Sequence, residues 1–223
     1  MKVYDYNIVK FDFFDTAVAD VLRAIDGGSL MGSFILSFCC IDYMGLAMNP
    51  AKEKNTSDDF RLFVRDWMSA ANESYRVLHD HLWAVRNSLI HTYGESRTTK
   101  HMNLSFSLSH EHPGNHLRLI EDPKPTLWLN LPDFVAELVA SIEHFFREKA
   151  SDESSLQTWY GKLIIVQGPA SYLERLDIVH RQKPEHKRSS RYLAILDSEP
   201  PATIGEITDH IAAELKRKIS KGS

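Results

Sequence analysis

The run from Leu30 to Met48 limits the possible folds of this chain more than any other feature. Asp42 is its only charged residue, and the run is nearly as long as the roughly 20 apolar residues that a membrane-spanning helix needs. Ser33 and Ser37 interrupt it, and no basic residue lies directly beside it. The sequence therefore predicts a buried central helix, apolar almost all round, that forms the core or a subunit interface.

The composition is that of a soluble intracellular protein. Of the 223 residues, 43% are hydrophobic and 25% are charged, which is enough for a core and ordinary for a soluble chain. The formal net charge of -4 predicts no general attraction to nucleic acid, so a polyanion site would have to be a local patch. The first residues lack the continuous apolar stretch of a signal peptide. We expect a cytoplasmic protein with no membrane partner.

The two cysteines, Cys39 and Cys40, are adjacent in the apolar run. Neighbouring residues rarely meet disulfide geometry, so no disulfide framework is expected. We predict two small buried side chains in a protein of a reducing compartment.

Hydrophobic periodicity predicts a mainly α fold, an antiparallel up-and-down helical bundle with a small β-ribbon insert. Ser29 is expected to cap the second helix, and Ser57 or Asp58 the third. Apolar residues alternate with polar ones over about 101–131, which predicts a small antiparallel sheet or ribbon. The expected helices span about 13–25, 30–48, 58–67, 73–93 and 133–150.

The character of the chain changes after about residue 150. We therefore divide it into a bundle region, 1–150, and a C-terminal appendage of uncertain fold, 151–223. The appendage is expected to end in an amphipathic helix from about 203 to 219, because isoleucine and leucine recur there at helical spacing.

The end of the fourth expected helix carries the most informative residues. Arg86 is followed by the polar Asn87 and, after four intervening residues, by His91. This pattern resembles the motif of the higher eukaryote and prokaryote nucleotide-binding (HEPN) superfamily, in which four to six residues separate an arginine from a histidine. An apolar second helix, a polar connector and a third helix precede the motif in the same order as in that family. The resemblance covers about residues 10–150.

The resemblance implies a helical bundle with metal-independent ribonuclease chemistry. His91 would act as general acid/base toward a ribose 2′-hydroxyl, because imidazole titrates near neutral pH. Arg86 would hold the scissile phosphate with its planar, permanently charged guanidinium, and Asn87 could orient either partner. The usual site of the family is composite, formed between two protomers, and implies a homodimer.

Helical geometry leaves two arrangements of the motif open, and a structural role is the alternative to both. Five helical steps turn Arg86 and His91 about 140° apart. They would meet if the helix unwinds locally or if two motifs face each other across a twofold axis. In the structural alternative, Arg86 pairs with Asp42 or Asp80, or caps the last carbonyls, and His91 is a favourable cation at the helix end.

Asp42, His79 and Tyr93 are further candidates for substrate binding. A carboxylate in so apolar a helix is costly unless it is paired, and the expected partner of Asp42 is Arg86 or Arg65. That pairing would place Asp42 at the edge of the site. His79 lies two turns before Arg86, and Tyr93 follows His91, so both could line the same groove.

A basic segment near the end of the chain could contact a phosphate backbone, although its charges favour an ordinary solvated loop. Its candidate residues are Arg181, Lys187 and Arg188. The histidine-rich turn at 110–116 lacks the spacing of a zinc site, so no metal site is expected, and no cofactor is expected either.

These observations predict an RNA-directed HEPN protein that acts as a homodimer. It would be a metal-independent endoribonuclease of a host-defence or toxin–antitoxin system, with an antitoxin or another protein as partner. The alternative is a non-catalytic HEPN module that binds a nucleotide, an RNA or a protein. A third possibility is a helical dimer in which Arg86 and His91 only stabilise the interface.

Overall fold

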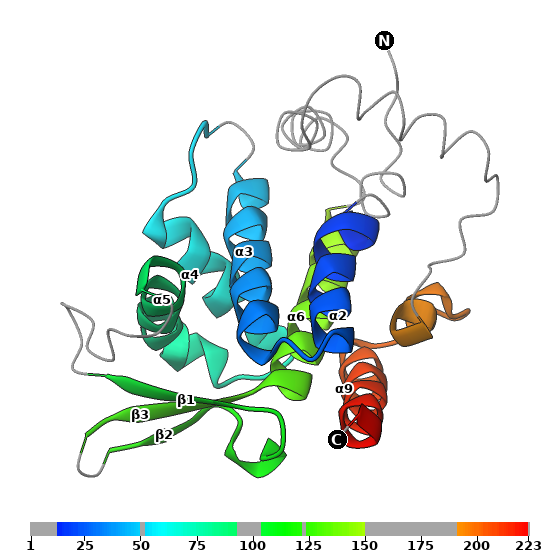
Figure 1. Ribbon diagram of the computed structural model, residues 1–223. Helices are drawn as coiled ribbons and strands as arrows, with labels where there is room; N and C mark the ends of the chain where they lie inside the picture. Colours follow the sequence, from blue (N-terminus) through cyan, green and yellow to red (C-terminus); the bar gives the residue numbers. More distant parts are fainter. Residues whose placement is uncertain (1–12, 50–51, 93–103, 122–123, 150–190, 223) are drawn as a thin grey trace, which may run out of the picture.

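The computed structural model describes residues 13–49, 52–92, 104–121, 124–149 and 191–222 (Figure 1). The described part is mainly helical, with one small sheet on one side of the helices, and this confirms the predicted class. A short π-helical turn, Phe14–Val18, leads into α2, Ala19–Asp26. The pair Gly27-Gly28 ends α2, and Gly28 takes the left-handed φ of 73° that glycine adopts without strain.

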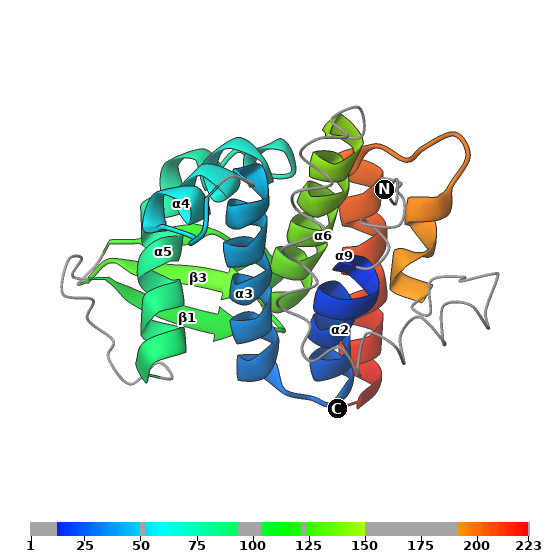
Figure 2. The ribbon, with the colours of Figure 1, turned by 90° about the horizontal axis from the view of Figure 1, so that it is seen from above.

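The apolar run forms α3, Leu30–Met48, the central helix of the fold. It lies between α2 on one side and α4 and α5 on the other (Figure 2). Its length and composition would allow it to cross a membrane, and half of it is buried inside the fold, which is compatible with the core helix of a soluble protein. Ser29 is the N-cap residue of α3, as predicted, but its side chain makes no capping hydrogen bond.

Helix α4, Ser57–Asp66, crosses α3 at Gly45. A Cβ at Gly45 would lie 2.9 Å from the backbone carbon of Asp59, so only glycine permits this approach. The predicted caps of α4, Ser57 or Asp58, are wrong. Thr56 is the cap, because its hydroxyl accepts from the Asp59 N–H while the Asp59 carboxylate accepts from the Thr56 N–H.

Three long helices complete the core: α5, Tyr75–Thr92, α6, Leu131–Glu148, and α9, Ile204–Gly222. The predicted inward residues of α5 and α6 are buried, as are Ile207, Ile211 and Leu215 of α9, whereas Ile204, also predicted to face inward, is only partly buried. Helix α9 packs along α6, and its side chains join the same hydrophobic core as the bundle. Three 3-10 helices, Met68–Ala70, Pro113–Asn115 and Arg191–Asp197, lie between the longer elements among the described residues. The boundary predicted near residue 150 lies outside the described residues.

The sheet differs in topology from the expected antiparallel ribbon. Strands β1, Ser105–Ser109, β2, Arg118–Ile120, and β3, Thr126–Asn130, form a sheet in the order β1-β3-β2. β3 pairs antiparallel with β2 but parallel with β1. β3 carries the most buried residues of the three strands. It lies in the centre of the sheet, where both of its edges form hydrogen bonds with a neighbouring strand. The serine-rich β1 and the short β2 take the edges.

Candidate functional site

The guanidinium of Arg86 forms a half-buried ion pair with Asp42, across α5 and α3. The Arg86 Nε and Nη2 atoms lie 2.9 and 2.5 Å from the same carboxylate oxygen, Oδ2 of Asp42. The two side chains are 17% and 19% exposed, so the pair is shielded but still reaches solvent. The predicted pairing of Asp42 with Arg86 is therefore confirmed. The other predicted partners do not contact this pair, because Arg65 binds Asp66 and Asp80 binds Arg61.

The polar connector before α4 holds Asp42 from the other side. The Asn55 side-chain amide donates to the Asp42 backbone carbonyl at 2.6 Å and lies 3.4 Å from its carboxylate Oδ1. The close approach of α4 to α3 at Gly45 brings the connector to this position. Asn55 thus links the helix crossing to the ion pair.

Trp83 and Asn87 complete the frame around Arg86. The Arg86 Cζ lies 5.0 Å from the centroid of the Trp83 ring, within the range of a cation–π contact. Nη1 of Arg86 donates to the Asn87 amide oxygen at 3.0 Å. Arg61 lies against the same ring, 5.4 Å from its centroid. Arg86 is therefore held by a carboxylate, an amide and an aromatic ring.

The ion pair does not fully offset the burial of Asp42. Burial raises the pKa of Asp42 above its ordinary value, while the hydrogen bonds and charge of Arg86 lower it by less. A folded-state pKa above the unfolded value means that the ionised carboxylate of Asp42 costs stability at neutral pH. The Asp42 carboxylate accepts two hydrogen bonds from Arg86, and these fix the orientation of the guanidinium.

His91 lies in the last turn of α5, and its side chain is exposed. It forms no ion pair or side-chain hydrogen bond with the described residues. Helix α5 stays α-helical through Thr92, so the local unwinding that could bring His91 to Arg86 does not occur. Within one chain, Arg86 and His91 therefore point about 140° apart around the helix axis.

The remaining predicted site residues do not join this cluster. His79 is quarter-exposed, and its Nδ1 lies 3.0 Å from the Arg76 backbone oxygen. Four candidates lie outside the described residues: Tyr93, Arg181, Lys187 and Arg188. No group of three metal-ligating side chains occurs among the described residues.

The histidine-rich turn supplies instead a buried hydrogen-bond network that sequence reasoning missed. The His116 Nδ1 accepts the Asn130 backbone N–H at 3.1 Å, which leaves its Nε2–H to donate to Glu137 at 2.8 Å. The Tyr75 hydroxyl donates to the same Glu137 oxygen at 2.6 Å, and Asn72 donates to the other oxygen at 2.9 Å. This network ties the sheet to α5 and α6. The spacing of His116 and Glu137 in the sequence gives no indication that their side chains meet.

Burial raises the pKa of Glu137, but hydrogen bonds from His116, Tyr75 and Asn72 outweigh it and leave the pKa below its ordinary value. Burial and the neighbouring Glu137 carboxylate raise the pKa of Tyr75. Both shifts indicate a satisfied structural network that keeps Glu137 ionised and Tyr75 protonated.

Sequence reasoning was also wrong about one cysteine. Both thiols are free, but only Cys40 is buried, whereas Cys39 lies on the exposed side of α3. Burial raises the pKa of the Cys40 thiol, which makes it inert. The periodicity of α3 could not separate the two, because the helix is apolar on nearly every side.

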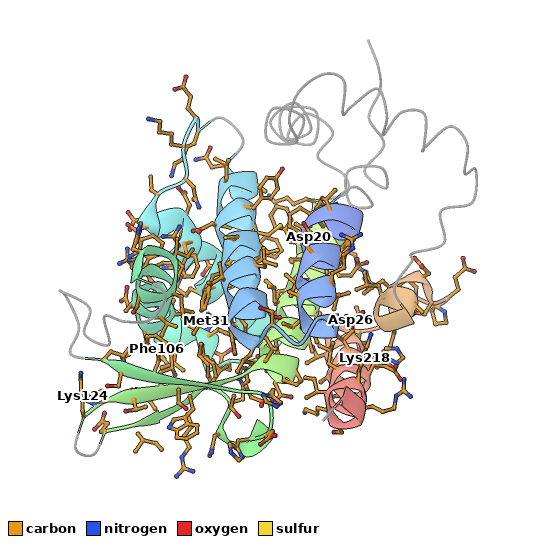
Figure 3. All side chains as sticks on the ribbon, in the orientation of Figure 1. Asp20, Asp26, Met31, Phe106, Lys124 and Lys218 are labelled. Atoms are coloured by element: carbon orange, nitrogen blue, oxygen red, sulfur yellow. The ribbon has the colours of Figure 1, made fainter. Side chains whose placement is uncertain are left out.

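A cavity of about 460 Å³ lies away from the motif, at the turn between α2 and α3. Its walls include Ser29, Ser33, His110 and Lys218, and none of the motif residues lines it. Lys218 also pairs with Asp26 at this turn, and both are labelled in Figure 3.

Comparison with protein-family models, with curated proteins and with solved structures finds no match for this chain.

Proposed function

We propose that this chain is an RNA-directed protein of the HEPN type, in which α2 to α6 correspond to the up-and-down bundle of that family. It would act in the cytoplasm as a metal-independent endoribonuclease of a defence or toxin–antitoxin system. The observation that carries this proposal is the frame around Arg86. Asp42, Asn87 and Trp83 hold the guanidinium in place, yet the Arg86 side chain remains 17% exposed, on the helix whose last turn carries His91.

The frame leaves donors of Arg86 for a substrate. A guanidinium carries five N–H donors, and hydrogen bonds to Asp42 and Asn87 use three of them. The other two, one on each terminal nitrogen, could bind two oxygens of one phosphate. Because the frame fixes the plane of the guanidinium, little side-chain freedom would be lost when RNA binds.

The chemistry follows from these two side chains. His91 would take the proton of a ribose 2′-hydroxyl while the 2′-oxygen forms a bond to phosphorus. The bond from phosphorus to the 5′-oxygen breaks, that oxygen takes up a proton, and the product is a 2′,3′-cyclic phosphate. Arg86 would stabilise the negative charge that builds up on the phosphate oxygens.

A dimer would bring Arg86 and His91 together. Because α5 is regular to its end, local unwinding does not bring the two side chains of one chain together. A site that uses both side chains would therefore combine Arg86 of one protomer with His91 of a second protomer across a twofold axis. The partly exposed apolar residues of α3, which lie on several sides of this helix, support α3 as part of the interface. They are Leu30, Met31, Ile35, Leu36, Tyr43 and Leu46.

The test is incubation of the purified protein with labelled single-stranded RNA in a metal chelator. Cleavage to cyclic-phosphate ends is expected, with rate losses of about a hundredfold or more for Arg86→Ala and for His91→Ala. Arg86→Lys should rescue poorly, because an ammonium cannot replace the planar fork. His110→Ala, another partly exposed histidine outside the motif, is the matched control and should cleave normally. Equal cleavage by His91→Ala and wild type would refute the proposal.

One observation favours the rival, a non-catalytic module that binds a nucleotide, an RNA or a protein such as an antitoxin. Asp42 already neutralises the charge of Arg86, as a purely structural ion pair would. A nucleotide-dependent rise in melting temperature without any RNA cleavage would support this rival.

A further inference from the structure

The strand register defines two faces of the sheet. Directly paired residues point to the same side, and successive residues along a strand point to opposite sides. Phe106 pairs with Leu127, and Leu108 with Leu129. Leu127 and Leu129 are fully buried, so this row faces the helices, and Figure 3 shows Phe106 on that side.

The other row therefore faces away from the helices, which all lie on one side of the sheet in Figures 1 and 2. Ser107, Trp128 and Arg118 stand side by side across the three strands in this outer row. Trp128 is partly exposed and Arg118 is exposed. No carboxylate belongs to the outer row among the described residues. Its other members are Ser105, Ser109, Thr126, Ile120 and Asn130, of which Asn130 is buried at the end of β3.

Arg118 is distinct from the other arginines whose side chains the structure describes. Each of the others forms an ion pair with a carboxylate, whereas Arg118 forms none with the described residues. The paired ones are Arg23, Arg61, Arg65, Arg76, Arg86, Arg147 and Arg217. A guanidinium that no described carboxylate neutralises, beside a partly exposed indole on the outer sheet face, has the charge that complements a polyanion.

We propose that the outer face of this sheet binds single-stranded RNA, with a base stacked on Trp128 and a backbone phosphate on Arg118. Aromatic side chains on a sheet stack unpaired bases, and arginine adds the phosphate contact. Lys124 lies just before β3, forms no ion pair with the described residues and extends the positive charge, while Glu121 lies just past the end of β2. A duplex would not fit this face, because its bases are already stacked.

This inference rests on the proposed function, since it takes RNA as the substrate, but its test measures binding and not cleavage. The probe is a fluorescently labelled single-stranded RNA of about 12 nucleotides, titrated with the full chain carrying His91→Ala to prevent cleavage. Trp128→Leu should weaken binding about tenfold or more, whereas Trp128→Phe, which keeps an aromatic ring, should stay within about threefold.

Arg118→Gln should lower the slope of log Kd against log salt concentration by about 0.7, the contribution of one phosphate contact on a single strand. Arg65→Gln is the matched control, because it removes an exposed arginine elsewhere and should leave binding unchanged. The melting temperature of each variant confirms that it folds. Because Arg118 is exposed, Arg118→Gln should fold normally, so the test stays decisive even if Trp128→Leu does not fold.

The outcomes separate this inference from the proposed function. Weaker RNA binding by Trp128→Leu and Arg118→Gln supports the sheet face, even if wild type cleaves no RNA. Normal RNA binding by both variants overturns it, even if wild type cleaves RNA through Arg86 and His91. Competition by duplex RNA as effective as that by the single strand also overturns it, because stacking on Trp128 requires unpaired bases.

Discussion

Replacing Gly45 by alanine should destabilise the protein by about 2 kcal/mol. A Cβ at this position would lie 2.9 Å from the Asp59 carbonyl carbon, 3.0 Å from its oxygen and 3.1 Å from the Phe60 nitrogen. All three atoms are backbone, so α4 has to move as a unit. Overpacking of this kind costs roughly 1–3 kcal/mol, and the upper end applies to a rigid neighbour. The better helix propensity of alanine returns about 1 kcal/mol.

Urea unfolding followed by circular dichroism measures this loss, which should lower the melting temperature by about 4–8 °C. Gly205→Ala is the matched control, because a Cβ there meets no atom within 4 Å and the site lies in α9. It should leave stability unchanged or raise it by up to about 1 kcal/mol. If Gly45→Ala were as stable as Gly205→Ala, the close crossing of α4 over α3 would be wrong.

Two further predictions concern charged groups. The pKa of Glu137 is lowered, so its contribution to stability is present above its ordinary value of 4.5 and is lost as the pH falls through the folded-state value. Glu137→Gln should therefore be roughly 1–3 kcal/mol less stable than wild type at neutral pH. In urea titrations, its free energy of unfolding should fall less steeply with decreasing pH than that of wild type. The same pH dependence in both proteins would contradict this prediction. Arg86→Ala should cost about 1–2 kcal/mol because it leaves Asp42 half-buried and unpaired, whereas exposed His91→Ala should stay within about 0.5 kcal/mol. Thermal unfolding of both variants checks this order, and a larger loss for His91→Ala would show that its side chain packs inside the fold.

The helices were predictable because their apolar spacing is strong. The second helix was expected over 30–48 and α3 spans Leu30–Met48, and the predicted inward residues of α5 and α6 are buried. Caps were less predictable, since the polar connector holds several adjacent residues that can cap a helix. Thr56 is preferred over Ser57 because Asp59 lies three residues later and closes the capping box.

The strand order could not be read from alternation, which gives the faces of a strand but not its neighbours. The parallel pairing of β1 with β3 depends on which strand is most buried, and that is a property of the assembled fold. The same limit applies to the buried network of His116 and Glu137, whose members lie in different elements.

Part of the candidate site was predictable from single residues. A carboxylate in an apolar helix needs a cation, and this argument led to the pairing of Asp42 with Arg86. Asn55 and Trp83 were missed as contacts of this pair, because a polar connector and a helix stripe give no indication of which side chain they will meet.

The most direct test of the composite Arg86/His91 site is RNA cleavage by an equimolar mixture of Arg86→Ala and His91→Ala proteins. Each variant alone should be inactive. After subunit exchange, about half of the dimers are mixed, and each mixed dimer retains one site with both side chains intact, so the mixture should recover about a quarter of wild-type activity. A mixture that stays inactive after exchange would contradict a site built from Arg86 of one protomer and His91 of the other.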